Sequence, residues 1–233
     1  MIPSPDLALT TKARTIFDLL VQEYGIPQRE PWDPMHELIL TILSANTNDV
    51  NSGRAFRTLM DRYDGDFNAI RTAPVDEIKA AIRVAGMYNQ KAPRLIRTLE
   101  MVWAERGAYT LDHVGEMTVA EGEAYLSRFP GVGHKTASIV LLFCFGKPAF
   151  PVDTHVQRLS QRLGICDPAA SPAKIKAIWE SGILGDDPDD YYALHINFIQ
   201  HGRTVCQARK PKCDECRLRR ICEYGQTTTA RSA

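Results

Sequence analysis

One stretch of the sequence combines a glycine-rich turn, a lysine and an aspartate. The residues Phe129-Pro-Gly-Val-Gly-His-Lys135 precede an apolar run, and Pro151-Val-Asp153 follows that run. A lysine amine can form a Schiff base with a sugar or carbonyl carbon, and an ionised carboxylate can stabilise positive charge on a substrate. The types and spacing of these residues therefore point to covalent amine chemistry beside a bound phosphate.

The turn itself suits an anion. Gly131 and Gly133 bracket Val132, and glycine permits positive φ and lets a ligand approach the main chain closely. The N-terminus of the following helix adds unpaired N–H donors. Thr118-Val-Ala-Glu121 is a capping box that opens a helix before the turn, so the segment is predicted to be helix, hairpin, helix. Such a unit can hold nucleic-acid phosphates without reading bases, although a bare G-x-G is also compatible with an ordinary turn between packed helices.

Lys135 and Asp153 each have a structural alternative. Lys135 falls in the first helical turn, where a cation opposes the helix dipole, and this is an unusual place for a lysine that serves only solvation. Asp153 precedes Thr-His-Val-Gln-Arg-Leu and is predicted to cap a helix that ends near Leu163. Capping and catalysis are compatible, because a capping carboxylate is fixed in direction.

Four of the six cysteines form a set with the spacing C-x6-C-x2-C-x5-C. Four thiolates suit tetrahedral zinc or an iron–sulfur cluster, and the presence of one C-x2-C pair, where zinc sites usually take two, leans toward a cluster. Disulfides are the third alternative. Cys144 and Cys166 are expected to be unreactive. The set consists of Cys206, Cys213, Cys216 and Cys222.

The composition gives no global sign of a nucleic-acid partner, since the net charge is zero and 24% of the residues are charged. Positive charge is instead concentrated between His201 and Cys222, where Arg209, Lys210 and Lys212 lie within the cysteine set. A solvated surface is the other explanation for such a run. No charged leader and no long apolar segment is apparent, so we expect a cytoplasmic protein with no membrane partner.

Helical periodicity dominates the sequence, and we predict an all-α protein. A central run of short helices, at about 37 to 148, is followed by a break at Pro148 and Pro151. The expected helices are 11–24, 34–43, 50–63, 75–84, 90–106, 120–127, 135–145, 154–163, 173–181 and 191–200.

Taken together, the motifs resemble the endonuclease III family of helix-hairpin-helix DNA glycosylases. The resemblance runs from about residue 12 to 224. It rests on Leu43-Ser-Ala-Asn-Thr-Asn-Asp49, Gly86-Met-Tyr-Asn-Gln-Lys91, Pro130-Gly-Val-Gly-His-Lys-Thr-Ala137, Val152-Asp-Thr-His155, His201-Gly-Arg203 and the four cysteines.

This resemblance implies two helical domains. One would be a six-helix barrel at 37–148 that contains the helix-hairpin-helix, and the other would combine residues 1–36 and 149–233 around a [4Fe–4S] cluster held by the four cysteines in a loop at 206–222. Damaged double-stranded DNA would be the partner, and the protein would be a nucleoid-associated monomer. The family's chemistry implies that an oxidised pyrimidine, such as thymine glycol, is rotated out of the duplex and removed.

The resemblance also implies roles for individual residues. Lys135 would attack C1′ and leave a Schiff base, Asp153 would stabilise charge on the sugar, and β-elimination would nick the strand 3′ to the abasic site. The DNA contacts would come from the hairpin main chain, the basic loop, and the residues Asn46, Met87, Gly131, Val132, Gly133, His155, Arg209, Lys210 and Lys212.

Three positions depart from the family pattern. Asn46 stands where a glutamine usually fills the gap left by the extruded base, Met87 replaces a leucine wedge, and His134 replaces an arginine. Asn46 could instead cap a helix, and Met87 and His155 could be packing or surface residues. We expect the reaction class to survive and the lesion preference to differ. A non-catalytic helix-hairpin-helix protein with a structural metal is the alternative from another class.

Overall fold

The computed structural model describes residues 6–229, and within that range the secondary structure is entirely helical. The prediction of an all-α protein is therefore confirmed. The chain divides into two compact units, one formed by Pro31–Phe145 and the other by Met1–Glu30 with Gly146–Ala233. These bounds lie a few residues from those predicted for the two domains, whose outermost residues, 1–5 and 230–233, fall outside the described range.

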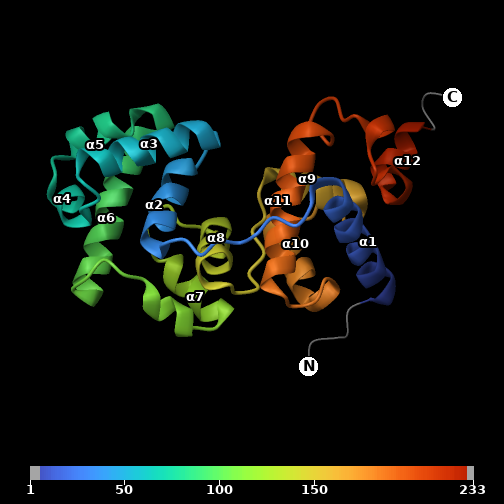
Figure 1. The fold of residues 1–233 in the computed structure, drawn as a ribbon, viewed down its shortest axis with the longest axis horizontal. Helices are drawn as coiled ribbons and strands as arrows, with labels where there is room; N and C mark the ends of the chain where they lie inside the picture. Colours follow the sequence, from blue (N-terminus) through green and yellow to red (C-terminus); the bar gives the residue numbers. More distant parts are fainter. Residues whose placement is uncertain (1–5, 230–233) are drawn as a thin grey trace. The chain divides into compact units, whose positions relative to one another are not determined.

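The unit at Pro31–Phe145 is a cluster of short helices in which α2 contacts α3, α6 and α8 (Figure 1). Residues 137–142 of α8 are all buried where this helix meets α2 and α7, and all of them except Ser138 are apolar. The elements of this unit are α2 (Pro34–Ser44), α3 (Asp49–Arg62), α4 (Phe67–Thr72), α5 (Val75–Ala81), the 3₁₀ turn η1 (Arg83–Ala85), α6 (Tyr88–Arg106), the 3₁₀ turn η2 (Asp112–Glu116), α7 (Val119–Leu126) and α8 (His134–Phe145).

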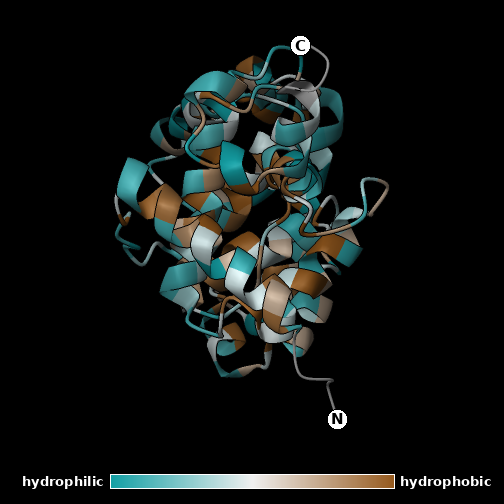
Figure 2. Cartoon of the chain, turned by 90° about the vertical axis from the view of Figure 1, so that its right-hand side faces the viewer, coloured by the Kyte–Doolittle hydropathy of each residue, from teal (hydrophilic) through white to brown (hydrophobic). Residues whose placement is uncertain are grey.

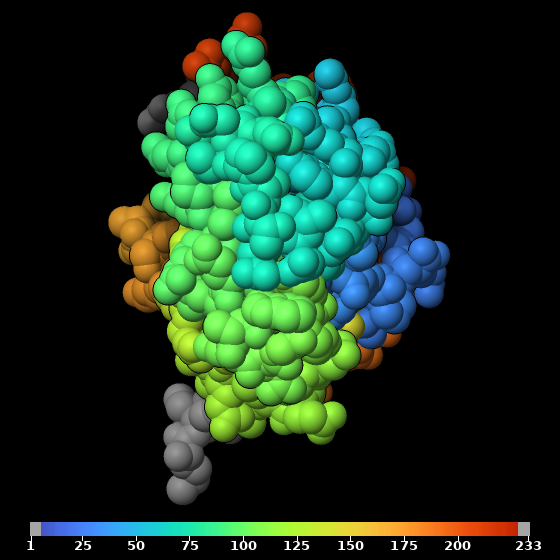
Figure 3. Space-filling model, turned by 90° about the vertical axis from the view of Figure 1, so that its left-hand side faces the viewer, coloured from blue at the N-terminus to red at the C-terminus, as the bar shows by residue number. Residues whose placement is uncertain are grey.

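The outer helices of this unit pack side by side. Contacts join α3 to α5, and both α4 and α5 to α6. The cyan and green segments in Figure 3 are this part of the surface, where these helices meet without a gap. The six-residue α4 was not predicted, because so short a helix has too little periodicity to identify.

The other unit packs α1 and α11 together with the helices that follow the proline break. Its elements are α1 (Leu7–Tyr24), α9 (Thr154–Leu163), α10 (Pro172–Ile178), the π-helical turn η3 (Trp179–Ile183), α11 (Pro188–Thr204), the 3₁₀ turns η4 (Cys213–Glu215) and η5 (Arg219–Ile221), and α12 (Glu223–Thr229). Figure 2 shows hydrophilic and hydrophobic residues alternating along single helices, as expected for amphipathic helices that surround a core.

An aromatic cluster fixes the segment that leads into α9. The ring of Phe150 lies 5.4 Å from that of Trp179 and 5.6 Å from that of Tyr191, measured between centroids. Trp179 Nε1 donates to Ser160 Oγ at 3.0 Å. His195 Nδ1 lies 3.0 Å from the carbonyl oxygen of Pro151. The main chain just before Asp153 is therefore held from several sides.

Candidate active site and cysteine centre

The helix-hairpin-helix has the predicted form. Thr118 and Glu121 make the capping box of α7, since Thr118 Oγ1 accepts from the Glu121 amide and the Glu121 carboxylate accepts from the Thr118 amide. The chain turns after Leu126 and enters α8 at His134. Val132 is buried beneath the turn, and its amide donates to the carbonyl oxygen of Phe129 at 3.1 Å.

The two glycines of the turn serve different purposes. Gly131 has φ of +88°, a backbone conformation that residues with a side chain rarely adopt. Gly133 has no positive φ, and a Cβ added there meets nothing within 4 Å among the described residues. Packing inside the described part of the protein therefore gives no reason for glycine at 133, whereas an external ligand at the main chain would.

The first amides of α8 are available to such a ligand. Gly133 has no side chain to cap them, and within residues 6–229 no acceptor faces the amides of His134 and Lys135. Unpaired N–H groups and the helix dipole together attract an anion. Lys135 is exposed in this first turn, as predicted.

Arg94 adds a positive charge that the sequence did not suggest. This exposed residue of α6 lies against the turn, since a Cβ on Gly131 would come within 3.0 Å of Arg94 Cδ. The sequence gives no sign of this contact, because α7 and most of α6 separate Arg94 from the turn along the chain.

Asp153 is the N-cap of α9, as predicted. Its Oδ1 accepts from the amides of His155 and Val156, each at 2.8 Å. Both of these bonds reach the same oxygen, so the cap fixes the carboxylate and does not use Oδ2. His155 is half-buried, and burial lowers the pKa of its imidazole.

The motif His201-Gly-Arg203 reflects a close approach of α9 and α11. A Cβ on Gly202 would lie 2.6 Å from His155 Nδ1, so only glycine fits. Arg158 Nη2 donates to the carbonyl oxygen of Gly202 at 2.9 Å, and its Nε donates to that of Cys206 at 2.9 Å. The helix that Asp153 caps thus also supports the start of the cysteine loop.

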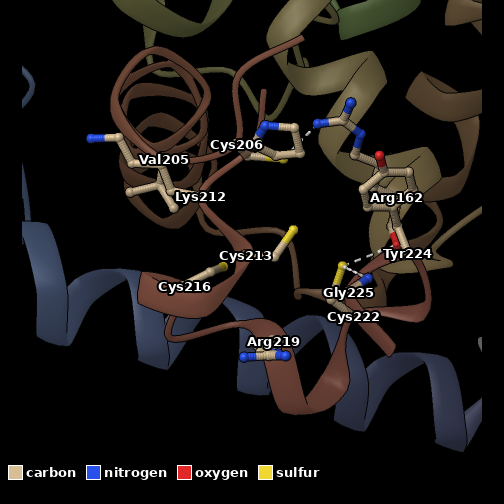
Figure 4. A pocket seen from close by; sticks show the side chains of 11 residues that line it. Arg162, Val205, Cys206, Lys212, Cys213, Cys216, Arg219, Cys222, Tyr224 and Gly225 are labelled. Carbon is tan, nitrogen blue, oxygen red and sulfur yellow. Dashed lines mark hydrogen bonds between the residues drawn. The ribbon is translucent and has the colours of Figure 1, made fainter. Parts of the chain in front are cut away.

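The four cysteines line one small cavity that opens to solvent (Figure 4). All four are free thiols, so the disulfide alternative is not realised. Among the described residues no three His, Cys, Asp or Glu side chains are arranged around one point as ligands of a single ion.

The surroundings of the sulfurs test whether a metal group fits. Arg162 Nη1 donates to Cys206 Sγ at 3.3 Å, and the Gly225 amide donates to Cys222 Sγ at 3.4 Å. Such donors stabilise thiolates that bind iron. Burial raises the pKa of the Cys216 thiol to about 11, and a metal bound to this sulfur would favour the thiolate. Four thiols around a cavity, with N–H donors on two of them, fit a polynuclear group.

Arg162 was not identified from the sequence. In addition to Cys206, its guanidinium donates to the carbonyl oxygens of Gln207 at 2.9 Å and Ala208 at 3.0 Å, and it lies 4.5 Å from the ring centroid of Tyr224. It therefore ties α9 to both ends of the cysteine loop. The three basic residues between Cys206 and Cys213 are exposed; they are Arg209, Lys210 and Lys212.

Comparison with known proteins agrees with the fold and the hairpin. Residues 39–183 match the HhH-GPD superfamily of base excision DNA repair proteins. This match defines the class as a helix-hairpin-helix DNA repair protein.

Curated relatives are more specific. Endonuclease III of Sulfolobus acidocaldarius is 34% identical over 91% of this chain and 96% of its own length. Endonuclease III of Escherichia coli is 34% identical over 82% of this chain and 84% of its own length. A solved complex of a trapped endonuclease III–DNA covalent intermediate matches with a TM-score of 0.78 and 26% identity, over 94% of this chain and 98% of that one. A non-covalent endonuclease III–DNA complex matches with a TM-score of 0.79 over 95% and 98%.

The chain belongs to the endonuclease III family. It is a base excision repair DNA glycosylase and AP lyase that binds DNA, which sets aside the non-catalytic alternative. Within residues 6–229, no helix is both long and apolar enough to cross a membrane.

Proposed function

We propose that this protein removes oxidised pyrimidines, such as thymine glycol, from double-stranded DNA and then cleaves 3′ to the abasic site. The observation that carries the proposal is the exposed Lys135 beside uncapped amides at the N-terminus of α8. Those amides and the turn at Gly131–Gly133 would bind a backbone phosphate and so bring the adjoining sugar to the amine.

In this proposal the uncharged amine of Lys135 bonds to C1′ of the deoxyribose as the bond from C1′ to the base breaks, and the base leaves with its electron pair. Opening of the sugar gives a Schiff base between Lys135 and C1′. Loss of a proton from C2′ then expels the 3′ phosphate, and water releases the enzyme from the sugar. The Asp153 carboxylate stabilises positive charge on the sugar.

The remaining predicted site residues would hold the DNA. Asn46 and Met87 would occupy the space left by the extruded nucleotide, and His155 would contact the backbone. The exposed basic loop at 209–212 would contact phosphates. We further propose that the protein acts as a monomer.

A [4Fe–4S] cluster is the group proposed for the cysteine cavity, since all four cysteines line it and N–H groups donate to the sulfurs of Cys206 and Cys222. When bound, the cluster would organise residues 206–222 in place of a hydrophobic core. Cys206, Cys213, Cys216 and Cys222 would hold it, and Arg162 would support its loop.

Borohydride reduction during incubation with a thymine-glycol duplex tests the proposed nucleophile. Wild-type protein should form a stable covalent complex, and Lys135→Gln should form none. Lys174→Gln is the matched control, because Lys174 is also an exposed lysine in the first turn of a helix, α10, whose amides are capped by Ser171. Trapping by Lys135→Gln at the wild-type level would refute the assignment.

A further inference from the structure

Lys91 is a buried lysine whose amine binds main-chain carbonyls. It lies on α6 with 1% of its surface exposed. Its Nζ donates to the carbonyl oxygen of Leu43 at 2.7 Å and to that of Ala85 at 2.8 Å. Burial lowers the pKa of this amine. Burying an ammonium group costs free energy unless the group is well hydrogen-bonded. Lys91 therefore does not serve to keep the surface soluble, and its role must lie in the contacts that its amine makes.

The two acceptors close two separate helical elements. Leu43 lies in the last turn of α2, and Ala85 is the last residue of η1. Carbonyls at such ends lack helical partners and carry partial negative charge. The Lys91 ammonium therefore caps the C-terminal ends of both α2 and η1. In doing so it links the start of the loop after α2 to the start of the loop after η1.

Each of these loops presents one exposed, strained residue. Asn46 has φ of +54° and Met87 has φ of +47°, values in the left-handed region that residues other than glycine seldom adopt. The Asn46 side-chain nitrogen lies 3.6 Å from Met87 Sδ. Asn48, not Asn46, caps α3, so the alternative in which Asn46 is a helix cap does not hold.

We propose that Lys91 is a positioning residue that holds Asn46 and Met87 together as one two-pronged wedge for opening the DNA duplex. The inference rests on the proposed function, because it concerns how the target nucleotide is extruded. Strained residues persist only where the surrounding structure fixes them. Apart from the direct contact of Asn46 with Met87, the Lys91 amine is a buried contact that holds the bases of both loops.

The role predicts a loss that depends on the substrate. Without the amine, both loops relax and the side chains of Asn46 and Met87 move apart. These two side chains must then be brought together again before each nucleotide can be extruded, which slows the extrusion step. Misplacement of about 1 Å can cost about 100-fold in rate. No such cost arises where the lesion is already unstacked, because no wedge is then required.

The test uses the full chain with its cluster as purified. Single-turnover release of thymine glycol is measured from a fully paired duplex and from a bubble in which the lesion and its neighbours are unpaired. Lys91→Met should slow release from the duplex by about 10- to 100-fold and leave release from the bubble within about two-fold of wild type. Lys79→Met is the matched control, since it removes a lysine of α5 in the same unit that pairs with Asp76, and it should match wild type on both substrates.

Coupling to the wedge is tested by combining Lys91→Met with Met87→Ala. If Lys91 acts through Met87, the double variant should lose less than the product of the two single losses. Amide hydrogen exchange supplies a readout without DNA: the Thr47 amide, which bonds to Ser44, and the Gly86 amide, which bonds to Arg83, should exchange faster in the Lys91 variant.

Equal losses on duplex and bubble would show that Lys91 only stabilises the fold and would overturn the proposal, as would unchanged release from the duplex. Should Lys91→Met lose its helical circular dichroism, Lys91→Gln, which keeps two N–H donors, is carried through the same comparison and judged by the same ratio. A wild-type protein that releases no base from either substrate would refute the proposed function instead, which separates the two failures.

Discussion

Asp153 allows the structural and catalytic roles of one carboxylate to be separated. Its Oδ1 caps α9 through two amide hydrogen bonds of 2.8 Å. In Asp153→Asn, the amide oxygen can accept the same two bonds, so the stability should change by no more than a few tenths of a kcal/mol. In Asp153→Ala, the cap is lost, which should cost about 0.5–2 kcal/mol.

Both variants should lose activity to a similar extent. Each removes the negative charge that would stabilise the sugar cation, and loss of one such electrostatic group costs about 10²- to 10³-fold, or about 2.7–4 kcal/mol of transition-state stabilisation. The stabilities of the two variants should therefore differ while their rates do not. Urea unfolding followed by circular dichroism measures the first quantity, and single-turnover release of thymine glycol measures the second.

Asp187→Asn is the matched control. Asp187 caps α11 in the same unit, with Oδ1 accepting from the Asp189 amide at 2.9 Å, so this variant removes the same charge from an equivalent cap. It should keep the wild-type rate. If Asp153→Asn also keeps the wild-type rate, or if the rates of the Asp153 variants follow their stabilities, the carboxylate has no catalytic role.

Three further predictions concern packing, metal and DNA contact. Gly202→Ala places a Cβ 2.6 Å from His155 Nδ1 and should destabilise the protein by about 1–3 kcal/mol in urea unfolding, whereas Gly133→Ala, which meets nothing within 4 Å among the described residues, should keep its stability and bind duplex more weakly. Cys213→Ser should lower bound iron and visible absorbance in the purified protein, and a colourless wild-type protein that contains zinc would contradict the proposed cluster. Lys210→Gln should weaken duplex binding and reduce the slope of log K against log salt by about 0.9 if this side chain contacts one phosphate, and an unchanged slope would exclude that contact.

Much of the local structure could be predicted because its causes are local. Helix ends were identified where a capping side chain and its amides lie within three residues, as at Thr118 and Asp153. Element ends were less certain where no such signal exists: the helix predicted at 173–181 ends at Ile178 and continues as a π-helical turn, with Gly182 at φ of +90°. The catalytic roles of Lys135 and Asp153 stay predictions.

The sequence by itself determined the longer helices, the hairpin, the lysine at its end and the four cysteines as one set, since each follows from periodicity, capping or short spacing. Only the tertiary structure decided which groups far apart in the chain meet. Lys91 resembles any surface lysine until its amine is seen to reach Leu43, at a separation of 48 residues, and Arg162 gives no sign of its contact with Cys206, 44 residues away. The physical reason is that burial and long-range hydrogen bonds depend on how helices pack, and no local pattern encodes that packing.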